Sequence, residues 1–228
     1  MLLLSRFMRR LRRDGLWSTL RGIRSATRPE TLGIYRIERL VAPAPAAGLE
    51  IKAGVESLRQ LRRGILLLPD EFYCEDRAGF VQCYCALSDG LLAGIIWVLE
   101  GPNASRYIAL REGEVELSYL HVLEAMRGRG IAKHLYWRAA ADCLNRGAQR
   151  VYAVISSDNY PSRKAAETIG FRKIAEIRRT ALWGRKFRAE SSDCPEQVAS
   201  LETRRAGVGA RSRDQQVTED IVRTAERL

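Results

Sequence analysis

The chain has 228 residues, of which 46% are hydrophobic, and a formal net charge of +11. This composition excludes a disordered chain, because the apolar residues suffice for a core, and no run of 18 apolar residues is long enough for a membrane-spanning helix. Only five of the 38 basic residues are lysine, and the positive charge favours phosphate-bearing partners without identifying one. We expect one domain over residues 29–190, preceded by an extension over 1–28 and followed by a polar tail over 191–228.

The five cysteines lack the paired C-x-x-C spacing of a zinc or redox site. Cys83 and Cys85 are alternate residues of an apolar run, which favours ordinary packing over metal binding. We therefore expect no metal site and a reducing compartment, the cytoplasm. The opening MLLLSRFMRRLRR has too short an apolar stretch, in the wrong order, for a secretory signal.

Residues 1–28 contain eight arginines and a single acid, Asp14. Apolar residues recur among them at spacings of three and four, which predicts two short basic amphipathic helices separated at Gly15. Such a segment could lie peripherally on an anionic membrane, dock on the domain or serve as a mitochondrial transit peptide. Nucleic-acid binding is less favoured, because no known binding motif accompanies the charge.

The first half of the domain reads as a series of strands with one helix. LGIYRIERL (32–40) predicts a strand, and LEIKAGVESLRQLRRG (49–64) a helix that ends at Gly64. GFVQCYCAL (79–87) and LLAGIIWVLEG (91–101) flank the turn Ser-Asp-Gly and predict a hairpin. EVELSYLHV (114–122) predicts a further strand.

The second half alternates helices and strands. Apolar pairs recur every four residues from Ile131 to Leu144, which predicts an amphipathic helix that ends at Gly147. RVYAVIS (150–156) predicts a strand, SDNYPSRKAAETIG (157–170) a turn and a short helix, and the segments 171–179 and 181–188 a closing strand pair. A last helix could form near the C-terminus, over 215–228.

Two glycines and two arginines stand immediately before the helix that begins at Ile131. Gly128 and Gly130 allow a tight turn and a close approach of the backbone to a ligand, so that successive N–H groups can converge on an anion. The positive end of the helix dipole favours the same ligand, and Arg127 and Arg129 add positive charge. The sequence therefore predicts a phosphate site here, although a glycine-rich turn with two solvated arginines is the structural alternative.

The order strand, Arg127-Gly-Arg-Gly-Ile-Ala132, amphipathic helix and strand, followed by Asn159 and Gly170-Phe171, resembles the GNAT superfamily of acyl-CoA-dependent N-acyltransferases. Arg127, Gly130 and Ala132 occupy the three defined positions of that family's cofactor loop. A dinucleotide-binding Rossmann site fits less well, because the spacing is not G-x-G-x-x-G and the preceding strands form a hairpin.

The resemblance covers roughly residues 35–188 and implies a single α/β domain, with a mixed, strongly twisted sheet of about six to seven strands flanked by helices. It implies that the strands 114–122 and 150–156 splay apart and that the pantetheine arm of acetyl-CoA or another acyl-CoA lies between them. The cofactor-binding residues implied are Leu120, His121, Val122, Arg127, Gly128, Arg129, Gly130, Ile131, Ala132, Asn159 and Ser162. The Val122 N–H would also face the thioester oxygen and stabilise an oxyanion.

The implied activity is acyl transfer, with acetyl as the expected group, to an amine that attacks the thioester directly in a ternary complex. Glu116 occupies the position of the catalytic base of several family members, and the alternatives are a solvated carboxylate or a salt-bridge partner. Regular alternation puts Glu116 and Ser118 on one face of the strand and His121 on the other, so we expect His121 to be packed or hydrogen-bonded. His134 is expected on the surface.

The general acid has no clear candidate in the sequence. Many relatives carry a tyrosine four residues before Gly-Phe, where this chain has Ala166. Tyr160, Ser162 and Tyr119 are the remaining candidates, with Tyr160 preferred. A catalytically silent acyl-CoA-binding module, or a long-chain acyltransferase that works at a membrane surface, therefore stays open as an alternative function.

Overall fold

The computed structural model describes residues 30–63, 65, 67–75, 80–102, 107–180 and 184–189. The expected segments 1–28 and 191–228 lie outside the described residues. In chain order, with η marking a short 3₁₀ helix, the elements are β1 (Glu30–Ile37), β2 (Leu49–Ala53), α2 (Val55–Arg62), η1 (Asp70–Tyr73), β3 (Phe80–Ser88), β4 (Leu91–Glu100), β5 (Glu114–Val122), η2 (Glu124–Met126), α3 (Ile131–Asn145), β6 (Arg150–Ser156), α4 (Tyr160–Thr168), β7 (Phe171–Thr180) and β8 (Gly184–Ala189).

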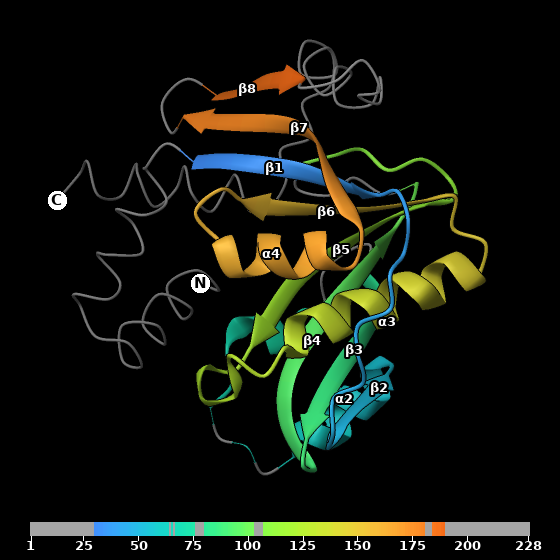
Figure 1. Cartoon of the computed structure of the whole chain (residues 1–228), viewed down its shortest axis with the longest axis vertical. Coiled ribbons are helices and arrows are strands. Elements are labelled where there is room, and N and C mark those ends of the chain that lie inside the picture. The colour runs from blue at the N-terminus through green and yellow to red at the C-terminus, as the bar shows by residue number, and fades with distance from the viewer. Residues whose placement is uncertain are drawn as a thin grey trace, which may run out of the picture.

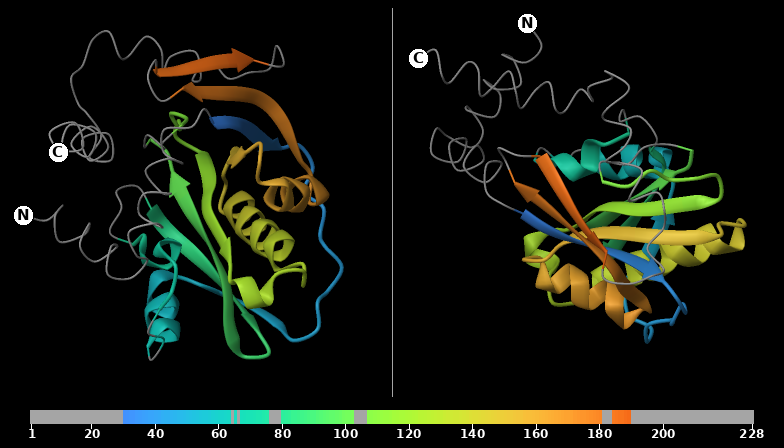
Figure 2. Two further views of the ribbon diagram at one scale, coloured as in Figure 1. Left: turned by 90° about the vertical axis from the view of Figure 1, so that its left-hand side faces the viewer. Right: turned by 90° about the horizontal axis from the view of Figure 1, so that it is seen from above.

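These elements form a single twisted sheet between two helical layers (Figure 1). The strand order is β2-β3-β4-β5-β6-β1-β7-β8, and β5 and β6 are parallel while the other neighbours are antiparallel. Helices α3 and α4 cover one face, and α2 with η1 lies on the other (Figure 2). The expected α/β fold class is confirmed, with eight strands where six to seven were expected.

The additional strand lies where the sequence predicted the start of a helix. In LEIKA, apolar residues alternate with Glu50 and Lys52, which is the period of a strand, and the segment pairs with β3 from Leu49↔Ser88 to Ala53↔Tyr84. Gly54, at φ 99°, then separates β2 from α2. The prediction of a continuous helix over 49–64 was therefore wrong in its first third.

The central strand β5 contains a bulge. Its register against β4 moves from Trp97↔Ser118 to Ile95↔His121, so β5 has one residue more than β4 there, and Tyr119 adopts a φ of 50°. A bulge shifts the alternation of the side chains that follow it. Glu116, Ser118 and His121 pair with Leu99, Trp97 and Ile95, which are alternate residues of β4 and so share a face. Because paired residues also share a face, His121 lies on the same face as Glu116 and Ser118. The prediction of opposite faces was wrong.

Three clusters of apolar side chains hold the layers together. One lies between the sheet and α3 with α4, and includes Leu117, Leu135 and Phe171. Another lies under α2 and η1 and includes Leu58, Phe72 and Trp97, together with Cys83 and Cys85, which pack there as the sequence predicted. The third is centred on β1 and β7.

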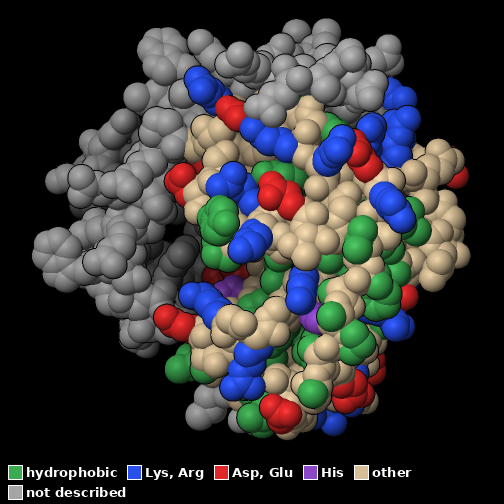
Figure 3. Space-filling view, in the orientation of Figure 1, with side chains coloured by type: hydrophobic (Ala, Val, Ile, Leu, Met, Phe, Trp, Pro, Cys, Tyr) green, Lys and Arg blue, Asp and Glu red, His purple; other side chains and the backbone are tan. Residues whose placement is uncertain are grey.

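On the face shown in Figure 3, the positive charge is not gathered on one element. Figure 3 shows Lys and Arg side chains spread over the face in view, with Asp and Glu among them. Among the described residues, no helix combines the length and apolar character needed to cross a bilayer.

Candidate active site

The loop before α3 has the backbone that the sequence predicted. Gly128 has a φ of 81° and Gly130 a φ of 74°, values that L-residues with a side chain rarely adopt. Among the described residues no side chain caps the start of α3, and its first turn contains no acid. The first N–H groups of a helix have no partner within the helix. The geometry therefore fits an anion held by backbone N–H groups at this end of α3.

Gly128 and Gly130 differ in the space around them. A Cβ at Gly128 would meet nothing within 4 Å, whereas a Cβ at Gly130 would lie 2.9 Å from Lys133 Cε. The turn at Gly128 is therefore open to a ligand. Gly147, at φ 93°, follows the other end of α3 and also has nothing within 4 Å.

The two arginines of the loop are tied to neighbouring elements. Arg127 Nε donates to the carbonyl oxygen of Val122 at 3.4 Å. Arg129 Nη1 donates to Ser88 Oγ at 3.2 Å and lies 3.6 Å from Asp89 Oδ2, with its side chain 54% exposed. Both guanidinium groups thus lie beside the loop, and Arg129 links it to the β3–β4 turn.

The strands β5 and β6 pair only along their first halves. Their register runs from Glu114↔Arg150 to Leu117↔Ala153, although β5 continues to Val122 and β6 to Ser156. The two strands diverge beyond that point in Figure 1. This is the splay that the resemblance implied.

The backbone of Val122 faces away from β4, toward the splay. The Leu123 N–H donates to the Ala93 carbonyl of β4 at 2.9 Å, and successive N–H groups of an extended strand point to opposite sides. The Val122 N–H therefore points to the β6 side, as an oxyanion contact requires. The carbonyl of His121 faces β4, since a Cβ built on Gly94 would lie 2.8 Å from its oxygen.

Two buried carboxylates of β5 have different surroundings. Glu114, 3% exposed, accepts hydrogen bonds from the Arg111 N–H at 2.9 Å, Arg150 Nη1 at 3.2 Å and the Tyr152 hydroxyl at 3.3 Å. Glu116 is 2% exposed, and its Oε1 accepts a hydrogen bond from Ser118 Oγ at 3.1 Å. Burial excludes the alternative in which Glu116 is a solvated carboxylate.

The two histidines occupy different environments. His121 Nδ1 lies 3.4 Å from Glu71 Oε2, and its ring meets Phe72 edge to face at 5.9 Å. The side chain is 23% exposed, so it is packed and paired as expected. His134 was expected on the surface but is buried, and its pKa is lowered by this burial and by Lys133.

Of the three residues proposed to act near the leaving group, Tyr160 and Ser162 lie at the start of α4, whereas Tyr119 does not. The Asn159 side chain accepts from the Ser162 N–H at 3.2 Å and caps the helix. Tyr160 is 60% exposed, with the Arg163 guanidinium 5.7 Å from its ring centre. Tyr119 packs edge to face on Phe80 at 5.4 Å, away from α4.

One hydroxyl in this region was not singled out from the sequence. The Tyr136 hydroxyl of α3 lies 3.0 Å from Ser162 Oγ. Burial raises its pKa to about 12, although the hydrogen bond with Ser162 acts the other way. In the sequence, the position of Tyr136 on the apolar face of the helix indicated only a core residue. Glu71 was also missed, because nothing in the sequence connects it with β5.

Two contacts link the predicted donor-binding segments to their neighbours: Arg127 of the loop bonds to Val122 of β5, and Ser162 of α4 lies beside the Tyr136 hydroxyl of α3. In the part of the chain that the structure describes, no group of three or more His, Cys, Asp or Glu side chains is placed to hold a metal ion.

Comparison with known proteins supports the sequence resemblance. The model of the acetyltransferase (GNAT) family matches residues 55–171, about half of the chain. No curated protein matches the chain.

Among solved structures, a GNAT-family protein from Novosphingobium aromaticivorans is 20% identical, with a TM-score of 0.47 and coverage of 66% of this chain and 63% of that one. A GCN5-related N-acetyltransferase from Kribbella flavida is 12% identical, with a TM-score of 0.45 and coverage of 72% and 59%. The aminoglycoside N-acetyltransferase AAC(6')-Iy in complex with CoA is 22% identical, with a TM-score of 0.42 and coverage of 58% and 93%. The chain thus spans about three-fifths of the length of the first two proteins.

Proposed function

Because the chain belongs to the acetyltransferase (GNAT) family, we propose that it is an enzyme that transfers an acyl group from an acyl-CoA thioester to an amine. The observation that supports this most strongly is the loop before α3. Its two positive-φ glycines, its uncapped helix start and its two arginines fit a pyrophosphate. Acetyl-CoA is the first candidate for the donor.

The donor would extend from this loop into the splay between β5 and β6. Backbone groups of Leu120 and Val122 on β5 would pair with the pantetheine arm. The carbonyl of His121 is directed to β4, so its contribution to the arm would be small. Ile131 and Ala132 begin α3 and would supply N–H groups to the phosphates.

The amine would attack the thioester carbon directly, in a complex that holds both substrates. The Val122 N–H would stabilise the oxyanion of the tetrahedral intermediate. Glu116 would accept a proton through the Ser118 hydroxyl, which already bonds to its carboxylate at 3.1 Å, and through water. Tyr160 or Ser162 would assist the departing thiolate.

An assay of acyl transfer tests this proposal. Purified protein is incubated with acetyl-CoA and a panel of amines that includes a polyamine, an aminoglycoside and a short peptide, and the release of free CoA thiol is measured. Transfer to any of them supports the proposal. Tight CoA binding without transfer would instead favour the silent acyl-CoA-binding module, for which Ala166 at the tyrosine position is the argument.

The extension over 1–28 bears on where the enzyme works. Its basic amphipathic pattern supports a cytoplasmic enzyme that binds peripherally to an anionic membrane through these residues. Flotation with anionic liposomes, with and without these residues, tests this. Equal flotation of the two forms would end the membrane proposal.

A further inference from the structure

The bulge of β5 places an imidazole beside the position proposed for the thioester. His121 immediately precedes Val122, whose N–H faces the splay. The shifted register puts the His121 side chain on the same face of β5 as Glu116 and Ser118. Glu116 pairs with Leu99 and Val122 with Gly94, five residues apart on β4, so at about 3.4 Å per residue the two lie roughly 17 Å apart along the strand. The His121 side chain is therefore much nearer to the reacting carbon than Glu116 is.

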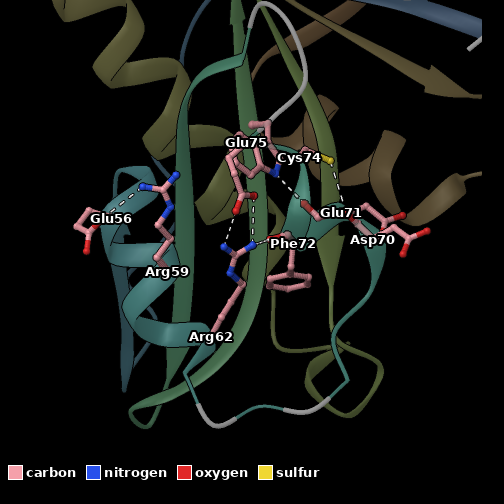
Figure 4. Close-up of polar contacts among 9 residues, drawn as sticks. Glu56, Arg59, Arg62, Asp70, Glu71, Phe72, Cys74 and Glu75 are labelled. Carbon is pink, nitrogen blue, oxygen red and sulfur yellow. Dashed lines mark hydrogen bonds and ion pairs between the residues drawn. The ribbon is translucent and has the colours of Figure 1, made fainter. Parts of the chain in front are cut away.

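The partner of His121 comes from η1, which is anchored at several points (Figure 4). Trp97 Nε1 donates to the Glu71 carbonyl at 2.7 Å. Arg62 Nη1 donates to the Phe72 carbonyl at 2.6 Å. A carboxylate on such a fixed turn can hold an imidazole in one orientation.

The same anchor includes a partly buried ion pair next to η1. Arg62 also binds both carboxylate oxygens of Glu75, at 3.2 and 2.5 Å. Burial would raise the pKa of Glu75, but the hydrogen bonds and charge of Arg62 outweigh it and the pKa is lowered. Glu75 is thus committed to Arg62, and Glu71 supplies the carboxylate that reaches His121.

The chemistry requires more than one proton acceptor. A protonated amine loses two protons when it becomes an amide, and the departing thiolate takes back only one. The first proton must leave before attack, because the ammonium has no lone pair. The second proton, from the tetrahedral adduct, would reach Glu116 through water and the Ser118 hydroxyl, which donates to its carboxylate, because Glu116 lies farther along the strand.

We propose that His121 accepts the first proton of the amine and that Glu71 positions its ring, so that the acceptor approaches along the η1 side of β5. This rests on the proposed acyltransferase function. With Nδ1–H donating to Glu71, the Nε2 lone pair faces away from that carboxylate and takes the proton. The neutral amine then forms the N–C bond of a tetrahedral adduct, which gives up its second proton toward Glu116 and breaks its C–S bond. Of the two protons lost by nitrogen, one is taken up by the departing CoA thiolate and the other passes to solvent, which restores the neutral imidazole and the carboxylate.

Other charged groups lie on the elements around His121. They are Asp70 on η1, the Arg62–Glu75 pair between α2 and η1, Glu116 on β5 and Glu124 on η2. In the structure, Glu71 is the carboxylate in direct contact with the imidazole. Arg127, which donates to the carbonyl of Val122, is a further cation on the donor side of His121, whereas the carboxylate of Glu71 on the η1 side suits an acceptor that arrives as a cation.

The test compares the full chain with His121→Ala, Glu71→Gln and the double variant, using acetyl-CoA and the best amine of the panel. We expect His121→Ala to lower kcat/KM about 100-fold, with CoA affinity unchanged and the protein still folded, and added imidazole to restore at least a tenth of the wild-type rate. Glu71→Gln should lower kcat/KM about ten-fold alone, but less than two-fold in the His121→Ala background, because it acts through His121.

Two matched controls separate this role from a general loss of charge or of a histidine. Glu56→Gln changes an exposed carboxylate of α2, and His134→Gln changes the other histidine. Activity within two-fold of wild type is expected for Glu56→Gln, and no rescue by imidazole for His134→Gln.

The outcomes distinguish the two proposals. Full activity of His121→Ala, or a loss that imidazole does not restore, would overturn the role of His121 while leaving the acyltransferase intact. Additive losses in the double variant would overturn the positioning role of Glu71. A wild-type protein that transfers no acetyl group to any amine would overturn the proposed function itself.

Discussion

The two sides of β5 are built in different ways. On the proposed donor side, the main groups are backbone N–H groups of one continuous segment, which comprises the end of β5, the loop and the start of α3. On the acceptor side, Glu71 of η1 reaches His121 of β5, fifty residues away in the chain, and the groups are side chains. A backbone site of this kind suits a donor common to a family, whereas the side-chain site is where this chain can select its own acceptor.

The largest effect on activity should come from Glu116, the buried carboxylate of β5 that is proposed as a base. Glu116→Gln should lower kcat about 100-fold or more, because the amide cannot accept a proton. CoA affinity, measured by calorimetry, should stay unchanged.

Glu114→Gln is the matched control, since both carboxylates are buried on β5. It should lower stability by about 1.5–3 kcal/mol, the range for hydrogen bonds to charged groups, with kcat within a few-fold of wild type. If the two variants exchanged these phenotypes, the assignment of Glu116 as base would fail.

On the donor side, Gly128→Ala should weaken CoA binding ten- to a hundred-fold. The free protein has room for the methyl group. Apart from the strain of a positive φ, any loss of CoA affinity therefore reflects a clash between the methyl group and the bound ligand. Gly147→Ala introduces the same strain at the other end of α3, with the same open space. Equal CoA affinity in the two variants would argue against a phosphate at Gly128.

A smaller effect is expected from the charge beside the loop. Arg129→Ala should weaken CoA binding about five-fold at low salt and less at high salt, because the charge is exposed and screened. Arg138→Ala is the control, as this arginine is also half exposed and paired, with Asp142 at 3.0 Å. A salt dependence unchanged by Arg129→Ala would place the anion elsewhere.

The smallest effect concerns the packing behind the donor site. The pKa of Tyr136 is raised to about 12, above its usual value of about 10, so folding favours its neutral form. Its contribution to stability is complete below pH 10 and is lost as the pH rises toward 12. Between pH 8 and pH 11 the wild type should lose about 1.4 kcal/mol more than Tyr136→Phe, as measured by urea unfolding. Equal losses would show that the hydroxyl titrates normally.

The backbone of the loop before α3 could be predicted from the sequence because its signals are local. The glycines, the arginines and the helical periodicity of α3 are contiguous, and backbone geometry follows from them. The hairpin of β3 and β4 was predictable because two apolar, β-rich segments flank a Ser-Asp-Gly turn. The short alternation of LEIKA was missed because a helix-like segment follows it directly.

The acceptor side could not be read because its signals are not local. The bulge at Tyr119 has no sequence marker, since the residue at φ 50° is neither glycine nor asparagine, and it moved His121 to the other face. The pairing of Glu71 with His121 depends on where η1 packs. Tyr136 was recognised as core, but the position of its hydroxyl near Ser162 depends on how α3 and α4 meet.

Calorimetric titration of the full chain with CoA, acetyl-CoA and a long-chain acyl-CoA tests the central claim most directly. The account predicts saturable binding of CoA and acetyl-CoA, and the chain-length preference would indicate which acyl group is transferred. Absence of binding by all three would contradict it, and the loop before α3 would then be only a turn between a strand and a helix.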